Sequence, residues 1–152
     1  MNRLELIKRV RNLTRDLSNS IFRENDIIEF LNEGVDRVRQ IVPELSSMPH
    51  LELHEDVPKY LPESHHSLIA LYATSRCFTQ DERHYQATNF MNEFEIKMEE
   101  FTQNVESGRI KINVDGVDIS AGNANDYVVN NYFDVKSYVT SFDYPEDEDL
   151  EV

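Results

Sequence analysis

Five histidines and one cysteine are the side chains in this sequence best suited to bind a metal. A zinc site needs several such ligands at characteristic spacings. His50 and His54 lie in a proline-rich stretch, where a four-residue spacing does not form a helical pair. His65 and His66 are neighbours, so on a helix they point toward different faces. We therefore expect surface histidines and no metal site.

Nucleophile and phosphate-binding motifs are equally weak. Cys77 falls within an apolar helical pattern and is expected to be a small core residue. The stretch "NVDGVDISAGNAND" has acids near glycine, as calcium loops do, but it lacks their carboxylate ladder and closing glutamate. The four glycines do not form a phosphate-binding loop. We expect no cofactor and no enzymatic activity.

Two sets of charged residues have helical spacing. Lys8, Arg11 and Arg15 share one side of a predicted helix, and they either contact phosphate or an acidic protein or form a solvated face. Glu95 and Glu99 lie four residues apart on another predicted helix. From the spacing alone, they are expected to face solvent.

Charge is distributed unevenly over the 152 residues, which carry a net charge of −14. Residues 1–42 have a balance of +1, whereas residues 109–152 have −7. This gradient argues against general nucleic-acid binding and favours an acidic extension on a more neutral body. A single cysteine fits a reducing compartment, and no apolar run is long enough to cross a bilayer. We expect a protein made in the cytoplasm.

Hydrophobic periodicity predicts about four helices in a small antiparallel bundle, so the predicted fold class is mainly α. The first helix runs from Arg3 to about Asp16 and the second from about Glu24 to Pro43. Pro62 begins the third, and a capping box at residues 79–82 begins the fourth, which ends near residue 106. The predicted apolar stripes are Leu4, Ile7, Val10, Leu13 and Leu17 in the first helix, and Tyr85, Ala87, Phe90, Phe94, Met98, Phe101 and Val105 in the fourth.

A β-hairpin is predicted after Gly108, which suits a left-handed helix C-cap. Apolar residues alternate on both sides of an Asp115-Gly116 turn, which is a strong hairpin signal. The alternating residues are Ile110, Ile112, Val114, Val117 and Ile119. The predicted organisation is a helical bundle domain at 1–108, followed at 109–152 by the hairpin and a long extended arm.

The arm combines aromatic residues with a strongly acidic end, "PEDEDLEV". Disordered segments are normally poor in aromatics. We therefore expect the aromatics to anchor the arm in pockets on a partner, and the acids to suit a basic groove. The alternative is an acidic solubility tag. The predicted anchors are Tyr127, Tyr132, Phe133, Tyr138, Phe142 and Tyr144.

The helical body resembles the head-to-tail adaptor (connector) proteins of tailed bacteriophages over about residues 20–106. The resemblance rests on Phe22 ahead of a helix, Leu31-Asn32 within it and Leu61-Pro62 at the next helix start. It also includes the run of Phe78, Asp81-Glu82, Tyr85-Gln86-Ala87, Phe90 and Phe94.

The resemblance implies a structural virion protein at the head–tail junction. Such adaptors form a ring, usually of twelve copies, that joins the portal protein to tail proteins and lets DNA pass without reading its sequence. Their C-terminal extensions reach along the portal, so the arm here is expected to bind the portal or neighbouring subunits. The resemblance also implies that the hairpin pairs with another subunit through Ile110, Ile112, Val114, Val117 and Ile119. If charge lines the channel of the ring, Glu95 and Glu99 are candidates to repel DNA, and Lys8, Arg11 and Arg15 are the competing candidates. Two alternatives remain open: an acidic DNA-mimic inhibitor, and a helical regulatory module with a docking tail.

Overall fold

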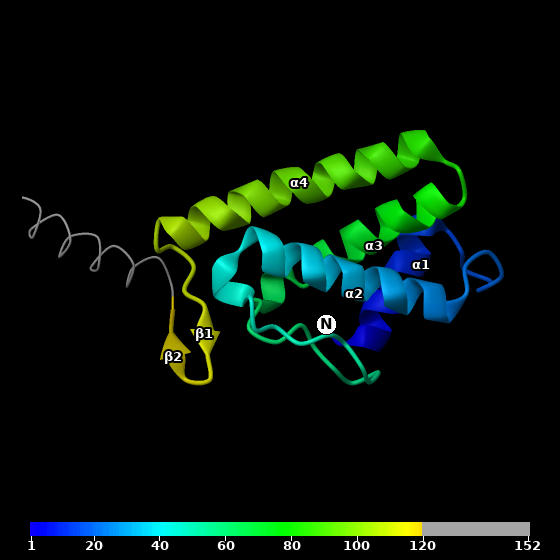
Figure 1. Ribbon diagram of the computed structural model, residues 1–152. Coiled ribbons are helices and arrows are strands. Elements are labelled where there is room, and N and C mark those ends of the chain that lie inside the picture. Colours follow the sequence, from blue (N-terminus) through cyan, green and yellow to red (C-terminus); the bar gives the residue numbers. More distant parts are fainter. Residues whose placement is uncertain (120–152) are drawn as a thin grey trace, which may run out of the picture.

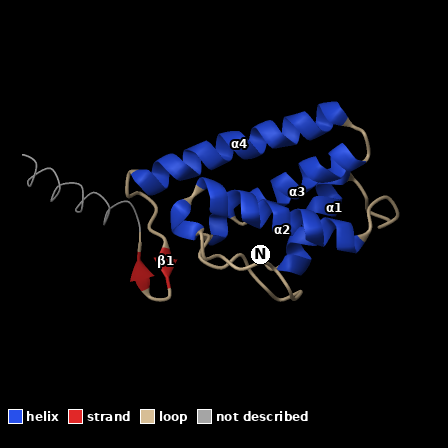
Figure 2. Ribbon diagram, in the orientation of Figure 1, coloured by secondary structure: helices blue, strands red, loops and turns tan. Residues whose placement is uncertain are grey.

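The structure, a computed structural model, describes residues 1–119. This part of the chain consists mainly of four helices and a short β-hairpin (Figure 1). Figure 2 shows that helix dominates and that strand is confined to the hairpin. The helices are α1 (Arg3–Thr14), α2 (Glu24–Ile41), α3 (Ser67–Gln80) and α4 (His84–Glu106). The strands are β1 (Asn113–Val114) and β2 (Val117–Asp118). The predicted mainly helical class, with a hairpin after the bundle, is confirmed.

Helix α3 occupies the centre of the bundle. It packs against α1, α2 and α4, whereas α4 makes few contacts with α2. Nine of its fourteen residues are buried, including Ile69, Ala73 and Cys77. A helix that is apolar on nearly every side is stable only when other elements surround it. The small side chains of Ala70 and Ala73 let the neighbouring helices approach closely.

Helix α2 is the clearest amphipathic element. Ile27, Leu31, Val35 and Val38 recur at three- and four-residue steps, as one buried helix face requires, and all are inaccessible to solvent. Glu24 and Asp26 occupy the first turn, where the positive end of the helix dipole stabilises them. Proline at position 43 follows the helix and begins a short 3₁₀ turn, Pro43–Leu45. Both ends of this helix are therefore as the sequence predicts.

Helix α1 ends earlier than its predicted apolar stripe requires. Arg15 adopts a left-handed conformation with a φ of 60° and caps the helix after Thr14. Leu17 consequently lies beyond the helix and is 75% exposed, while Leu4 is also exposed. The stripe instead passes through Leu6, Ile7 and Val10, so its two predicted ends were wrong.

The segment between α2 and α3 crosses the start of α1. The backbone amide of Arg3 donates to the carbonyl of Asp56 at 2.8 Å, and that of Leu4 donates to His54 at 3.2 Å. Leu51 is buried, but Leu53 and Val57 are exposed. The segment is an extended loop with no paired strand, and a 3₁₀ turn at Glu63–His65 separates Pro62 from α3.

The turn between α3 and α4 differs from the predicted capping box. Helix α3 continues through Thr79, whose hydroxyl donates to the carbonyl of Ser75 at 3.0 Å. Glu82 has a φ of 59°, and the amide of Arg83 bonds back to the carbonyl of Phe78. These residues therefore close the end of α3, and α4 begins only at His84.

Helix α4 lies along α3, antiparallel to it (Figure 1). Phe94, Met98, Phe101 and Val105 are buried as the seam predicts. Tyr85, in the first turn of the helix, is 78% exposed, so the predicted seam is wrong at that position. Glycine at position 108 has a φ of 76° and ends the helix as predicted.

Candidate protein-binding site: a hairpin and two grooves

The hairpin turn has the geometry that its sequence favours. Asp115 and Gly116 have φ values of 51° and 87°, both in the left-handed region that a two-residue hairpin turn requires. The backbone amide of Gly116 donates to the side-chain oxygen of Asn113 at 2.9 Å. Asn113 pairs with Asp118 and Val114 with Val117. The predicted hairpin is therefore confirmed, although its paired strands are only two residues long.

The hairpin is attached to the bundle by apolar and polar contacts. Ile112 is fully buried in the helical core, and its carbonyl accepts a hydrogen bond from the amide of Ile119 at 2.8 Å. Tyr60 donates its hydroxyl to Asp115 at 2.9 Å, and the Lys59 ammonium lies 3.7 Å from the same carboxylate. The hairpin thus fixes the position from which the rest of the chain continues.

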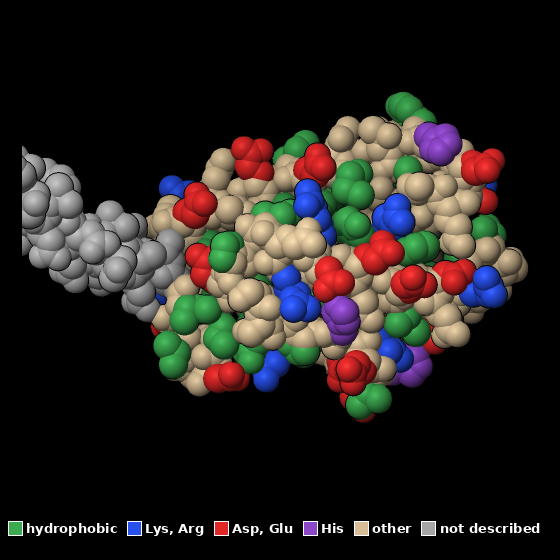
Figure 3. Space-filling view, viewed as in Figure 1, with side chains coloured by type: hydrophobic (Ala, Val, Ile, Leu, Met, Phe, Trp, Pro, Cys, Tyr) green, Lys and Arg blue, Asp and Glu red, His purple; other side chains and the backbone are tan. Residues whose placement is uncertain are grey.

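The five hairpin residues predicted to pair with another subunit have different surroundings. Ile112 belongs to the core of its own chain, so it is not free to contact a neighbour. Ile110, Val114 and Ile119 are partly buried against that core. Val117 is 60% exposed, and hydrophobic side chains gather over the hairpin in the space-filling view (Figure 3).

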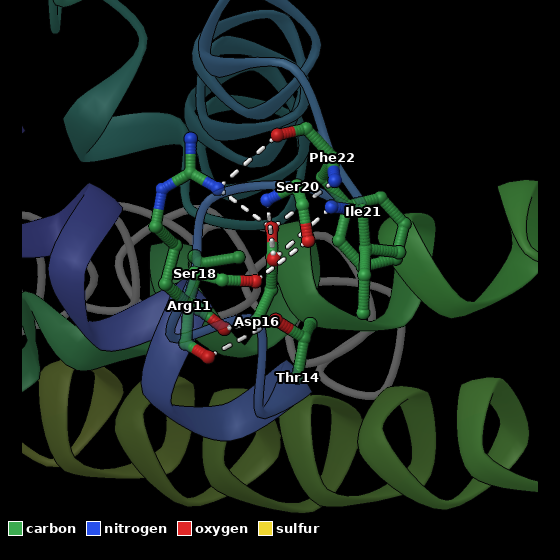
Figure 4. A network of polar contacts seen from close by, with 8 residues as sticks. Arg11, Thr14, Asp16, Ser18, Ser20, Ile21 and Phe22 are labelled. Atoms are coloured by element: carbon green, nitrogen blue, oxygen red, sulfur yellow. Dashed lines mark hydrogen bonds and ion pairs between the residues drawn. The ribbon is translucent and has the colours of Figure 1, made fainter.

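A buried ion pair involves one of the three predicted basic contact residues. Arg11 Nη1 donates to Asp16 Oδ2 at 2.7 Å and to the carbonyl of Phe22 at 3.1 Å (Figure 4). Lys8 and Arg15 are exposed, but Arg11 is buried. The prediction that all three residues share a basic face is therefore wrong, because the guanidinium of Arg11 points into the protein.

Asp16 also accepts backbone hydrogen bonds from the turn that follows α1. The amides of Ser20, Ile21 and Phe22 donate to its carboxylate at 2.9, 3.1 and 3.1 Å (Figure 4). Burial by itself would raise the pKa of Asp16, but these three amides and Arg11 outweigh it and lower the pKa. The carboxylate is therefore held in its charged form and organises the chain between α1 and α2.

A groove of about 370 Å³ lies where the end of α1 meets the turn between α3 and α4, and we call it the corner groove. Phe78 and Phe90 stack in it with ring centroids 5.6 Å apart. Exposed Arg15 and Arg83 supply its charge. Its full lining is Leu13, Thr14, Arg15, Phe78, Arg83, Gln86 and Phe90. The groove offers apolar contact and positive charge together.

A second groove, of about 430 Å³, lies between α2 and α4, and we call it the α2–α4 groove. The predicted channel residues Glu95 and Glu99 are both exposed and line it. Its full lining is Arg37, Ile41, Glu95, Met98, Glu99, Thr102, Gln103 and Glu106. Three carboxylates against one guanidinium make this groove acidic, in contrast to the corner groove.

Sequence reasoning missed the corner groove. Phe90 was expected as a core residue, Phe78 and Gln86 were named only for the family resemblance, and Arg83 was not singled out. Residues 13–15 and 78–90 meet only through the packing of α1 and α4 around α3. No local motif marks such a meeting of distant segments.

The structure corrects one expectation about the histidines, because His66 is buried and not on the surface. His66 accepts at Nδ1 from the α-amino group of Met1 at 2.9 Å, and its Nε2 donates to the carbonyl of Leu61 at 2.8 Å. His50 lies 2.7 Å from Asp36. Cys77 is buried, and burial raises the pKa of its thiol to about 12, which makes it a poor nucleophile. Among residues 1–119, no three His, Cys, Asp or Glu side chains lie close enough together to hold a metal ion.

The six predicted aromatic anchors, at positions 127, 132, 133, 138, 142 and 144, lie outside the described residues. Within residues 1–119, exposed apolar side chains are found in the turn after α1 and on α4. Leu17 and Ile21 lie in the turn after α1, and Tyr85 and Ile96 project from α4. These side chains offer contact area to a partner.

Comparison with protein-family models, with curated proteins and with solved structures finds no match to this chain. The class that the structure defines is a four-helix bundle completed by a docked β-hairpin. No helix in residues 1–119 combines the length and the apolar character needed to cross a membrane.

Proposed function

We propose that the chain is a structural virion protein, the head-to-tail adaptor of a tailed bacteriophage, with no catalytic role. Twelve copies form a ring that joins the portal to tail proteins and lets DNA pass. The observation that supports this proposal best is the docked hairpin. Because Ile112 is buried in the bundle, the chain leaves the body at a fixed point near Ile119.

The residues beyond that point can reach neighbouring molecules. Thirty-three residues follow Ile119, and a fully extended chain of that length spans about 110–120 Å. They include six aromatics, which can anchor the arm on the portal or on neighbouring adaptors. Eight acids against one lysine keep the free arm soluble and suit basic acceptor surfaces.

Exposed apolar groups on the body suit contacts between copies. Leu17 and Ile21 follow α1, whereas Ile96 projects from α4, and these two helices pack on different sides of α3. Contacts between two different surfaces of one chain produce a ring when the rotation between copies closes. This geometry supports a ring more directly than a two-fold dimer.

The channel face is assigned to α4. Exposed Glu95 and Glu99 would repel passing DNA and keep it mobile. The competing assignment places Lys8 and Arg15 against the DNA. Changing both to glutamate in assembled heads, and finding DNA retention unchanged, would eliminate that alternative. Arg11 is left unchanged because its substitution would break a buried ion pair.

Electron cryomicroscopy of the purified protein, alone and mixed with its candidate portal, tests the proposal. We expect rings on the portal, with density for the arm running along the portal or an adjacent adaptor. A matched variant with all six arm aromatics changed to serine should bind more weakly while its helical content stays the same. Monomers in both samples would refute the adaptor function and leave the DNA-mimic or docking-tail alternatives.

A further inference from the structure

The corner groove combines an aromatic floor with the positive charge of Arg15 and Arg83. Phe78 is buried and Phe90 partly buried, and their stacked rings form an apolar surface beside Leu13. Arg83 is paired with Asp81 at 2.9 Å, but Arg15 forms no ion pair within residues 1–119. No acidic residue lines the groove. Its occupant should therefore carry aromatic and acidic groups close together.

The chain itself contains such a segment. We propose that Phe142–Asp149, "FDYPEDED", binds in the corner groove. Phe142 and Tyr144 pack on the Phe78–Phe90 surface, and the acids after Pro145 lie near Arg15 and Arg83. An aromatic side chain buries about 150–250 Å², and an arginine beside it adds a favourable cation–π contact.

The α2–α4 groove serves as an internal comparison. It is similar in volume, but its three carboxylates would repel an acidic peptide. Charge therefore selects the corner groove over a neighbouring groove of about the same size. The α2–α4 groove can therefore serve as a control site in the same molecule.

The chain after Ile119 is long enough to reach the corner groove. The hairpin lies at the C-terminal end of α4 (Figure 1), and residues near the N-terminal end of α4 line the corner groove. The 23 residues of α4 separate them by about 35 Å. Twenty-three residues join Ile119 to Phe142 and extend about 76 Å, which suffices for the same chain or an adjacent copy.

Disulfide trapping in the full-length chain tests the assignment. Gln86→Cys in the corner groove is combined with Ser141→Cys beside Phe142, and oxidation is followed on non-reducing gels and by mass spectrometry. The control combines Gln103→Cys in the α2–α4 groove with the same Ser141→Cys. Both glutamines are exposed on α4, and native Cys77 is buried. We expect cross-linking about ten-fold faster for the Gln86→Cys pair, because binding raises the effective concentration of the two thiols. Equal rates would overturn the proposal.

A charge variant tests the role of the arginines. Arg15→Asn keeps a residue that tolerates the left-handed conformation, and with Arg83→Gln it removes two positive charges from the groove. We expect this double variant to slow cross-linking of the Gln86→Cys pair. Lys8→Gln with Arg37→Gln removes the same charge elsewhere on the surface and should leave the rate unchanged. Equal slowing by both double variants would show that only net charge matters and would refute specific recognition.

The inference deepens the proposed function, since it names the acceptor surface of the arm, but the two can fail separately. Cross-links between chains support both ideas. Cross-links within one chain support the groove assignment and argue against arms that join subunits. Rings that form on the portal while the Gln86→Cys pair fails to link would keep the adaptor function and refute the groove assignment.

Discussion

Among single residues, Asp16 contributes most to the path of the chain between α1 and α2. Its carboxylate accepts hydrogen bonds from Arg11 and from three consecutive backbone amides. The bonds from Arg11 and from the amide of Phe22 are buried, and leaving a buried donor without a partner costs about 1–3 kcal/mol. The Asp16 side chain therefore provides the hydrogen bonds that regular secondary structure would otherwise supply in this turn.

Asp16→Asn should destabilise the protein by about 3 kcal/mol, because it leaves the buried guanidinium of Arg11 without a counter-charge. Urea unfolding followed by circular dichroism measures this loss. Asp36→Asn is the matched control, since that carboxylate is half exposed and should contribute at most about 1 kcal/mol. Equal losses for the two variants would show that the Arg11–Asp16 pair is not a principal support of the fold.

His66 makes stability depend on pH in the mildly acidic range. Burial lowers the pKa of His66, by more than the carbonyl of Leu61 raises it. Because the folded-state pKa lies below the unfolded value of about 6.5, the unfolded state binds the proton more tightly. The contribution is complete above that value and is lost as the pH falls through the folded-state pKa.

Urea midpoints measured at several pH values from 7.5 to 5 should therefore fall more steeply for the native chain than for His66→Gln. Glutamine removes the titrating ring and keeps an amide donor for the carbonyl of Leu61. His84→Gln, at an exposed position, should leave the slope as it is. A slope that is unchanged in His66→Gln would assign the pH dependence to other groups.

At the scale of elements, hydrophobic periodicity predicted the helices well. The spacing of Ile27, Leu31, Val35 and Val38 specified both the existence of α2 and its buried face. The Asp115-Gly116 pair likewise predicted the hairpin, because few pairs of consecutive residues readily adopt left-handed conformations at both positions. These signals are local, so the sequence carries them directly.

Helix ends were predicted less well, because tertiary contacts decide between competing caps. The predicted capping box at 79–82 does not form, since α3 continues through Thr79 to Gln80 and buries Phe78. A capping box that was not predicted joins Asn2 and Glu5 at the start of α1. Both sequences fit the motif equally well, and only their positions relative to the core distinguish them.

The close approach of α2 and α3 gives a prediction at this scale. A Cβ atom at Gly34 would lie 3.3 Å from the carbonyl oxygen of Ile69 and 3.4 Å from the Cβ of Tyr72. Alanine favours a helix over glycine by about 1 kcal/mol, but overpacking costs about 1–3 kcal/mol. The crowding atom is a helix backbone oxygen, which moves only with its helix. Gly34→Ala should therefore lower the free energy of unfolding by about 1 kcal/mol.

Chemical denaturation of Gly34→Ala beside Gln40→Ala checks this expectation. Gln40 is exposed on the same helix, so its replacement should change the stability by about 0.5 kcal/mol or less. A gain of stability in Gly34→Ala would mean that helix propensity outweighs packing and that α2 and α3 separate without cost.

At the scale of the whole molecule, the binding surfaces are where the sequence is least informative. The corner groove joins residues from α1, α3, α4 and the connecting turn, and Arg11 turns inward although its spacing matches Lys8 and Arg15. Helical spacing defines which residues share a side of one helix, but it does not say which side the neighbouring helices cover.

The hairpin belongs to the same core as the helices, although the predicted domain boundary follows residue 108. Ile112 is fully buried, and Ile110, Val114 and Ile119 pack against that core. An isolated two-stranded hairpin is barely stable in water. The bundle therefore holds the hairpin in place, and the hairpin in turn covers part of the bundle.

This mutual dependence predicts that a hairpin substitution destabilises the helices. Ile112→Ala should lower the free energy of unfolding by about 3 kcal/mol, because it removes three buried carbon atoms and leaves a cavity. The loss should be seen in the helical circular dichroism signal as a shift of one cooperative transition. Val117→Ala, in the exposed part of the same hairpin, should shift that transition by about 0.5 kcal/mol or less.

If Ile112→Ala left the helical transition in place while the amide of Ile119 lost its protection from hydrogen exchange, the hairpin would be an independent unit. The chain would then leave the bundle at residue 108, and a fixed origin for the arm would no longer support the adaptor proposal.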